Sequence, residues 1–333
     1  LEAKQLELID EYLDTVKICD PAIGSGAFPM GLLQEIFSLK ELIANKLNKD
    51  FHPAKVKENI IQNSIYGVDI EKGAVDIARL RFWLSLVVDE ESPKALPNLD
   101  YKIVVGDSLV SKFEGEVVEI DWDTNGNVAK AGEFLKALKR TLKEISNKQS
   151  AFFEPENTNK EGLRKEIRNL KLDALHFQVS YNKEYYVQSN PYLGGFAPNG
   201  KQKKKNTTID LEVKKFNNLL KRIKPLKANA DESFDHFDWN LDFPEVLNPY
   251  LVSDEKERGF DIVIANPPYI KEYTNREAFD GFRDSPYYQG KMDIWYGFAC
   301  KSIDMLKPEG VECFIAQNNW VTSAGASIFR NKV

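Results

Sequence analysis

The sequence predicts an α/β fold: a doubly wound, mainly parallel sheet with a large, mostly helical insertion between its third and fourth strands. Short apolar runs alternate with segments whose apolar residues recur at helical spacing, and three successive runs end at or near an acidic residue. A long basic segment without this alternation separates the third run from the fourth. With 333 residues, the chain is long enough to bury a large core.

The first part of the chain predicts three strand-then-helix steps. A strand over residues 16–20 precedes a glycine turn and a helix over 28–43, and a strand over 65–69 precedes a helix over 74–88. A third strand over 101–105 ends at Gly106-Asp107-Ser108. In such a sheet a ligand binds beyond the carboxyl ends of the strands, where these acidic residues lie.

The alternation returns after a long interruption. We expect a strand over 260–265, a helix over 292–306, a turn at 307–310, a strand over 311–316 and a helix over 324–330. The predicted domains are a core formed by 1–108 and 259–333, incomplete at both ends, and a basic helical insertion at 109–258. Because the chain begins at Leu1 rather than Met, we expect it to be part of a longer polypeptide.

Composition excludes several classes of protein. Hydrophobic residues make up 42% of the chain and charged residues 29%, as in ordinary globular proteins. There is no basic-then-apolar leader and no apolar run long enough for a bilayer, so we expect a cytoplasmic protein without a membrane partner. Three cysteines without C-x-x-C spacing and three scattered histidines predict no metal site.

The net charge of -6 argues at first against a nucleic-acid partner. However, residues 130–227 hold about 22 basic and about 10 acidic side chains, so the insertion is basic and the remainder acidic. These cations either line one wall of a DNA cleft or form an ordinary solvated helical face, and both interpretations stay open. The candidates for the cleft are Arg164, Lys165 and Arg168, or Lys221, Arg222 and Lys224.

The turn from Asp20 to Gly26 lets a ligand approach backbone amides at a helix N-terminus, because its glycines lack side chains. It departs from the dinucleotide pattern G-x-G-x-x-G, since Pro29 takes the third glycine position. Asp20 would also repel a phosphate. An acid there favours a cationic ligand, such as the ammonium of a methionine moiety, although an ordinary strand-to-helix turn is the alternative.

Two further strand-end acids extend this prediction. Asp69 is placed to accept hydrogen bonds from ribose hydroxyls, with Ile70 beside it as an apolar wall for an adenine ring. Asp107 is placed to accept from the adenine amine. Each alone is equally well explained as a helix cap. Three acidic residues at the ends of successive strands together predict a pocket for a nucleoside that lacks phosphates.

The segment Asn266-Pro267-Pro268-Tyr269 follows an apolar strand. Two prolines remove backbone donors and stiffen the loop, so that the Asn266 side-chain oxygen and the Pro267 carbonyl can both accept from one amino group. Such acceptors turn the lone pair of a weakly nucleophilic amine toward an electrophile, and Tyr269 offers a face for a flipped base. A rigid turn without chemistry is the alternative.

These motifs together resemble the adenine-specific DNA amino-methyltransferases in which the cofactor motif precedes the catalytic motif, the gamma-type order. The similarity is greatest to the methylase region of single-chain (type IIG) restriction-modification enzymes and related phage-defence enzymes. It rests on residues 20–28 (DPAIGSGAF), 67–70 (GVDI), 106–109 (GDSL), 237–247 (FDWNLDFPEVL) and 260–270 (FDIVIANPPYI).

The resemblance implies a Rossmann-like methyltransferase fold that binds S-adenosylmethionine. It assigns the methionine end of that cofactor to Asp20, Ala22, Gly24 and Gly26. It implies that Asp69 binds the ribose and that Asp107 and Ser108 bind the adenine amine. Ile70, Pro268 and Phe298 would contact the faces of the adenine ring. The target adenine falls to Asn266, Pro267 and Tyr269. It implies direct transfer to the amine, and the absence of a Pro-Cys pair argues against methylation of a cytosine ring carbon.

The implied partner is double-stranded DNA with a flipped adenine, read by a C-terminal target-recognition domain beyond Val333; a nuclease domain before Leu1 stays open. We therefore expect that the chain alone does not methylate DNA sequence-specifically. One alternative is methylation of protein glutamine, RNA or the cytosine exocyclic amine. A second alternative is a non-catalytic nucleic-acid-binding fragment.

Overall fold

The computed structural model describes residues 2–89, 97–118, 120–123, 131–191, 200–229, 231–232 and 234–333. The side chains of residues 131 and 200–204 are outside this description. Lys130 and most of the side chains in the basic run 201–205, which contribute to the predicted charge of the insertion, therefore lie outside the described residues.

The centre of the molecule is a five-stranded parallel sheet in the order β3-β2-β1-β6-β7. Its strands are β1 (Ile18–Asp20), β2 (Ile65–Asp69), β3 (Ile103–Val105), β6 (Phe260–Ala265) and β7 (Leu306–Phe314). The chain builds outward from β1 in one direction and then returns to its other side. The order therefore reverses at β1, and a crevice forms beyond the carboxyl ends of strands at such a reversal.

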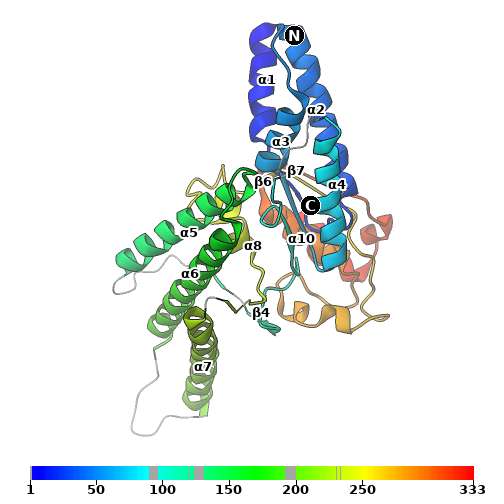
Figure 1. Ribbon diagram of the computed structural model, residues 1–333. Coiled ribbons are helices and arrows are strands. Elements are labelled where there is room, and N and C mark those ends of the chain that lie inside the picture. The colour runs from blue at the N-terminus through cyan, green and yellow to red at the C-terminus, as the bar shows by residue number, and fades with distance from the viewer. Residues whose placement is uncertain are drawn as a thin grey trace.

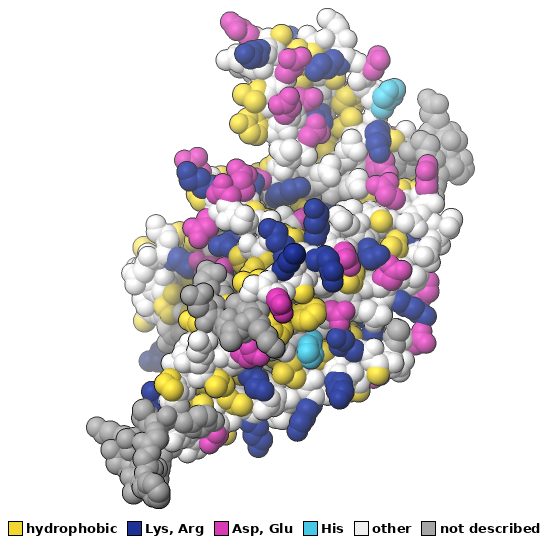
Figure 2. Space-filling model, turned by 90° about the vertical axis from the view of Figure 1, so that its left-hand side faces the viewer, with side chains coloured by type: hydrophobic (Ala, Val, Ile, Leu, Met, Phe, Trp, Pro, Cys, Tyr) yellow, Lys and Arg dark blue, Asp and Glu magenta, His cyan; other side chains and the backbone are white. Residues whose placement is uncertain are grey.

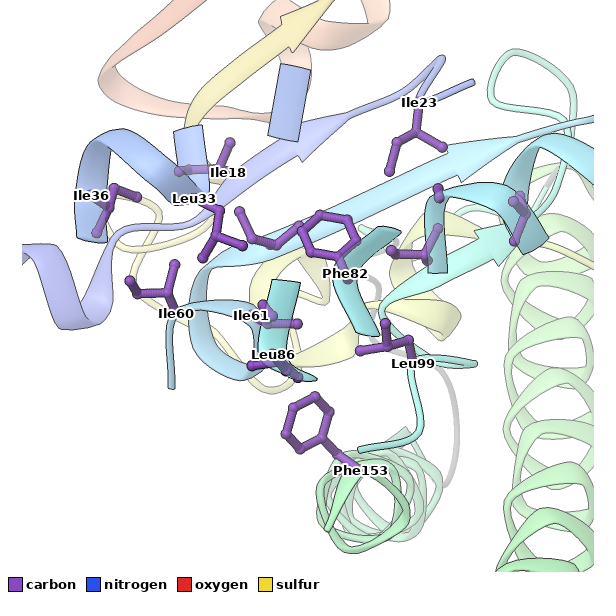
Figure 3. Close-up of a cluster of buried hydrophobic side chains, with 14 residues drawn as sticks. Ile18, Ile23, Leu33, Ile36, Ile60, Ile61, Phe82, Leu86, Leu99 and Phe153 are labelled. Atoms are coloured by element: carbon purple, nitrogen blue, oxygen red, sulfur yellow. The ribbon is translucent and has the colours of Figure 1, made fainter. Parts of the chain in front are cut away.

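One face of the sheet is covered by α2 (Ala27–Leu47), α3 (Pro53–Ser64) and α4 (Lys72–Val87). Their apolar side chains pack on those of the strands in a single buried cluster, which Figure 3 shows with Phe82 near its centre. Burial of each such side chain contributes about 1.5 to 3 kcal/mol. Phe153 joins this cluster from α5 (Ala131–Phe153), and thus anchors that helix to the core.

The opposite face is covered by elements that lie far apart in the sequence. Because side chains alternate along a strand, Ile18 faces the first cluster and Cys19 faces the second. The second cluster includes α8 (Trp239–Asp242), α9 (Pro244–Leu247) and the end of α10 (Trp295–Met305). The segment 237–247, which the sequence places in the insertion, thus packs on the sheet, and the domain boundaries remain a prediction.

Between β3 and β6 in the sequence lie α5, α6 (Lys160–Ser189) and α7 (Gly200–Ala228). This confirms the predicted helical insertion between the third and fourth strands of the sheet. The three helices share their own buried cluster, which includes Leu142, Leu175 and Ile223. Figure 1 shows them as a helical lobe that projects away from the sheet. A short hairpin, β4 (Lys112–Phe113) and β5 (Glu116–Val117), precedes them.

The remaining elements refine the predictions. The apolar pattern does not predict α1 (Ala3–Thr15), which has no buried residue, or α3. The predicted turn at 307–310 is a bulge inside β7, since Phe260 pairs with Leu306 whereas Ile262 pairs with Val311. The chain continues through short 3-10 turns to α11 (Ser327–Lys332). Within the described ranges, no helix has the length and apolarity needed to cross a bilayer.

The contact between Gly106 and Phe237 gives a test of how the insertion returns to the core. A Cβ atom at Gly106 would lie 2.3 Å from Cγ of the Phe237 ring. We expect Gly106→Ala to lower the free energy of unfolding by about 1 to 3 kcal/mol, because a buried ring must move. Urea unfolding measures this.

The matched control is Gly31→Ala in α2, where an added Cβ meets nothing within 4 Å. Helix propensity alone should raise its free energy of unfolding by about 0.5 to 1 kcal/mol. Equal stability of Gly106→Ala and the wild type would contradict the assigned packing.

Candidate functional site

The polar residues singled out from the sequence gather at one edge of the sheet. Asp20 is the last residue of β1, Asp69 the last of β2, and Asn266 follows β6 directly. The strands are parallel, with Asp20 opposite Gly67 and Asp69 opposite Val105, so their carboxyl ends are aligned. Asp107 follows β3 by two residues.

The glycine turn between β1 and α2 has a backbone that side chains disfavour. Gly24 has φ 52° and Gly26 has φ 80°, both in the left-handed region. A Cβ atom at Gly26 would also lie 3.1 Å from the Cβ of Ala78. The amide of Ile23 donates to the carbonyl of Val68 (3.0 Å), which ties the turn to β2. The turn therefore leads into the N-terminus of α2 without side-chain bulk at Gly24 and Gly26.

Asp20 is buried, with 1% of its surface exposed. Its Oδ1 accepts from the amide of Ala22 (3.0 Å), whereas its Oδ2 has no hydrogen-bond partner among the described residues. The pKa of Asp20 is raised to about 7, mainly by burial and also by the nearby charge of Asp69, whereas the hydrogen bond from the amide of Ala22 acts to lower it. A buried carboxyl with an unsatisfied oxygen is suited to receive a cation.

Asp69 lies at this edge of the sheet and also holds the glycine turn in place. Its Oδ2 accepts from the amide of Gly24 (2.8 Å) and its Oδ1 from the amide of Glu71 (2.9 Å). Each carboxylate oxygen keeps a further lone pair. The neighbouring Ile70 is 61% exposed, so its apolar side chain is open to a ligand.

Asp107 and Ser108 hold the loop that follows β3. Asp107 accepts from the amides of Leu109 and Val110 (both 3.1 Å) and pairs with Lys112 Nζ at 3.0 Å. The buried hydroxyl of Ser108 donates to the carbonyl of Pro21 (2.6 Å). Asp107 therefore caps its own turn, and Ser108 joins this loop to the glycine turn.

The segment that follows β6 presents its polar groups outward. Asn266, Pro268 and Tyr269 are exposed and Pro267 is buried. The Tyr269 hydroxyl lies within hydrogen-bond distance of Asn266 Oδ1 (3.0 Å) and of the carbonyl of Ile315 after β7. The acceptor oxygen predicted to hold an amine thus already faces a hydroxyl of the same loop. Phe298 is partly buried on α10.

Three contributors to this edge were not assigned a role from the sequence. The indole Nε1 of Trp239 donates to the carbonyl of Ser108 (3.0 Å), and Phe237 packs against Gly106. The aromatic run in residues 237–243 is a signal for both, since aromatic residues concentrate where apolar surface is buried. No sequence signal indicates the backbone carbonyl of Ile315, because every residue type has a backbone carbonyl.

Two cavities share part of their lining, and the first of them lies beside this edge. One of about 230 Å³ is lined by Asp107, Ser108, Trp239, Tyr287 and Lys301 among others, and one of about 250 Å³ shares the last three of these. Burial lowers the pKa of Lys301, against the charges of Asp238 and Asp304. The first cavity adjoins the predicted adenine end of the pocket, and Asp20 and Asn266 line neither cavity.

Within the ranges that the structure describes, no three His, Cys, Asp or Glu residues are grouped so that they could hold a metal ion. Cys19 and Cys300 are buried free thiols, and Cys313 is an exposed one.

Of the six cations proposed for a DNA cleft, four are engaged by the chain itself. Arg164 pairs with Asp100, Lys165 with Asp231, and Arg222 with Glu116, while Arg168 donates to the carbonyl of Leu226. Lys221 and Lys224 are exposed. For the four engaged residues, the structure favours the interpretation as an ordinary helical face.

Comparison with known proteins identifies the class. A family model for restriction-modification methylases matches residues 63–333, most of the chain, so the protein belongs to the methyltransferases of restriction-modification systems. Within that class it is a member of the Eco57I restriction-modification methylase family. It is also 31% identical, over 98% of its length, to a protein of Methanocaldococcus jannaschii described as a "putative type II restriction enzyme and methyltransferase". The chain spans 28% of the length of that relative.

The raised pKa of Asp20 predicts a pH-dependent stability. As pH rises above about 4, the unfolded chain loses this proton first, while the folded protein keeps it until about pH 7. Stability is thus fully present at low pH and is lost as pH rises through 7. Between these limits we expect the wild type to lose roughly 4 kcal/mol of unfolding free energy relative to Asp20→Asn.

Urea unfolding of both proteins across this range, without added cofactor, measures the difference. Subtracting the two curves removes the contribution of every other titrating group. Parallel curves would show that Asp20 titrates normally.

Proposed function

We propose that this protein transfers a methyl group from S-adenosylmethionine to the exocyclic amine of adenine in DNA, as the modification part of a restriction-modification or defence enzyme. The observation that carries this proposal is the placement of Asn266 directly after β6, the strand next to β1, which ends in the buried Asp20. A site for a cationic methyl donor and an acceptor for an amine thus lie at neighbouring strand ends.

The chain offers groups that fit each part of the cofactor. The unpartnered Oδ2 of Asp20 would receive the ammonium of the methionine moiety, and the open backbone at Gly24 and Gly26 would admit its chain. The remaining lone pairs of Asp69 would accept from the ribose. S-adenosylmethionine supplies the methyl group, and Ile70, Pro268 and Phe298 would border the adenine ring, with Asp107 and Ser108 near its amine.

The target amine would be held by Asn266 Oδ1 and the carbonyl of Pro267. Two acceptors bind both hydrogens of the amine and leave its lone pair directed at the methyl group, so that positioning provides most of the catalysis. As the amine enters, the Tyr269 hydroxyl would give up its contact with Asn266 Oδ1. The Tyr269 ring would then stack on the flipped base. This stacking would offset part of the cost of flipping the base, which is on the order of a few kcal/mol.

The proposal extends to parts of the protein outside this sequence. Because the chain spans 28% of the length of its relative, we propose that a target-recognition domain belongs to the same polypeptide and that sequence-specific methylation requires it. A nuclease domain in that polypeptide would complete a restriction enzyme. Cytoplasmic location follows from the same role.

The direct test is methyl transfer by the full-length protein. We expect label from S-adenosylmethionine to appear in duplex DNA and, after digestion, in N6-methyladenine. Asn266→Ala should reduce the rate by at least about 100-fold, since it removes an acceptor used at the transition state. Asn275→Ala, in an exposed loop of the same segment, is the control and should retain the rate.

Other products would replace this proposal with a named alternative. Label in 4-methylcytosine, RNA or protein glutamine would identify a different acceptor for the same two oxygen atoms. Cofactor binding without transfer to any of these would favour a non-catalytic fragment.

Cofactor affinity should depend on the protonation of Asp20. Pairing with an ammonium requires the carboxylate, whereas below about pH 7 the free site holds a proton. We expect the Kd for S-adenosylmethionine to rise about tenfold for each pH unit below 7. Titration calorimetry between pH 5.5 and 7 measures it, and Asp20→Asn should bind more weakly with little pH dependence. A wild-type Kd that stays constant over this range would remove Asp20 from the methionine site.

A further inference from the structure

Four cations of α5 lie on one face of that helix. They are Lys136, Lys139, Arg140 and Lys143, at positions i, i+3, i+4 and i+7. Residues at this spacing are neighbours on a helix surface. All four are exposed. We call these four residues the α5 stripe.

Several basic residues of the helical lobe are paired within the chain, but those of the α5 stripe are not. None of its four cations forms an ion pair or hydrogen bond within the described part of the chain, whereas Arg164, Lys165 and Arg222 do. Glu144 lies four residues after Arg140 but does not pair with it there. Acids therefore neutralise several cations of α6 and α7 and also Lys148 of α5, and leave the four cations of the α5 stripe free.

The opposite side of α5 fixes the direction of the stripe. Leu138, Leu142 and Ile145 are buried in the core of the helical lobe, so the stripe points outward. At the other end of the helix, Phe152 and Phe153 are buried, and Phe153 belongs to the cluster on the sheet. Figure 2 shows Lys and Arg side chains gathered across the middle of the face that the lobe presents. The stripe is thus a rigid, solvent-facing surface held at a set distance from the sheet.

We propose that the α5 stripe binds the phosphate backbone of duplex DNA beside the target site. At 1.5 Å per residue the stripe is about 10 Å long, the length over which one strand of B-DNA carries about three phosphates. Free, closely spaced cations match that spacing of negative charge. In a chain with a net charge of -6, they also give DNA a favourable point of approach.

The position of the stripe defines its role. It lies 10 to 17 residues before Phe153, or about 15 to 25 Å along the helix from the sheet. It would therefore contact DNA away from the flipped base. Such contacts set affinity and orientation without reading sequence. This inference rests on the proposed function, because it assumes DNA as the substrate.

The test is the salt dependence of binding of the full-length protein to a fluorescently labelled, mixed-sequence duplex between about 50 and 200 mM salt. The variant carries Lys136→Gln, Lys139→Gln, Arg140→Gln and Lys143→Gln, and glutamine preserves helix propensity. We expect the slope of log affinity against log salt to become less negative by about 3 to 4, and the affinity at low salt to fall at least about tenfold.

The matched control removes the same charge elsewhere. Lys4, Lys46, Arg81 and Lys256 are exposed, lie outside the lobe and have no side-chain partner among the described residues. Their replacement by glutamine should change the slope by less than about 1. An equal change in both variants would overturn the inference, because net charge alone would then explain the binding.

A second readout separates this inference from the proposed function. If the wild type methylates DNA and the stripe variant keeps its salt slope, the stripe does not bind DNA and the function stands. If the wild type neither binds nor methylates duplex DNA, the proposed function fails, and the inference fails with it. Urea unfolding of the stripe variant should match the wild type, since exposed substitutions change stability little.

Discussion

The parallel, in-register pairing of β1 with β2 on one side and β6 on the other is the constraint on which the site depends. It aligns strand ends that lie about 245 residues apart in the sequence, and thereby brings Asp20 and Asn266 to the same edge. Backbone hydrogen bonds impose this alignment and cores on both faces stabilise it. The glycine turn, the asparagine loop and the loop after β3 all begin from strand ends that this pairing has placed.

The edge combines a buried carboxyl that lacks a partner with an acceptor that its own loop occupies. Asp20 is buried with an oxygen that lacks a partner, and the Asn266 oxygen faces the Tyr269 hydroxyl. Burial of an unpaired carboxyl lowers stability, and its raised pKa is the measure of that cost. Such unsatisfied groups concentrate at functional sites, where a ligand supplies the missing interaction. In the proposed enzyme the cofactor ammonium would supply the missing partner of Asp20, and the target amine would bind Asn266 Oδ1 in place of the Tyr269 hydroxyl.

The helical insertion is joined to the sheet at two places. Phe153 enters the cluster on one face, and the segment 237–247 closes the other. A lobe anchored in this way keeps a set orientation relative to the edge, which is a requirement for any surface that positions a long, stiff substrate. The ion pairs between its own helices and loops also explain why its positive charge is not all available to a partner.

The sequence by itself determined the sheet class, the site of the insertion and the motifs at the strand ends, because periodicity and turn chemistry are local properties that a short window contains. The sequence did not indicate α1 and α3, and it could not show that 307–310 is a bulge rather than a free turn, since that depends on pairing with β6. Tertiary structure alone decided which atoms of the site are free. Asp20 keeps an open oxygen, Asp107 caps its own loop, and four unpaired cations lie together on one face of α5. The physical reason is that hydrogen bonds and ion pairs form between residues distant in sequence, so their assignment requires the folded chain.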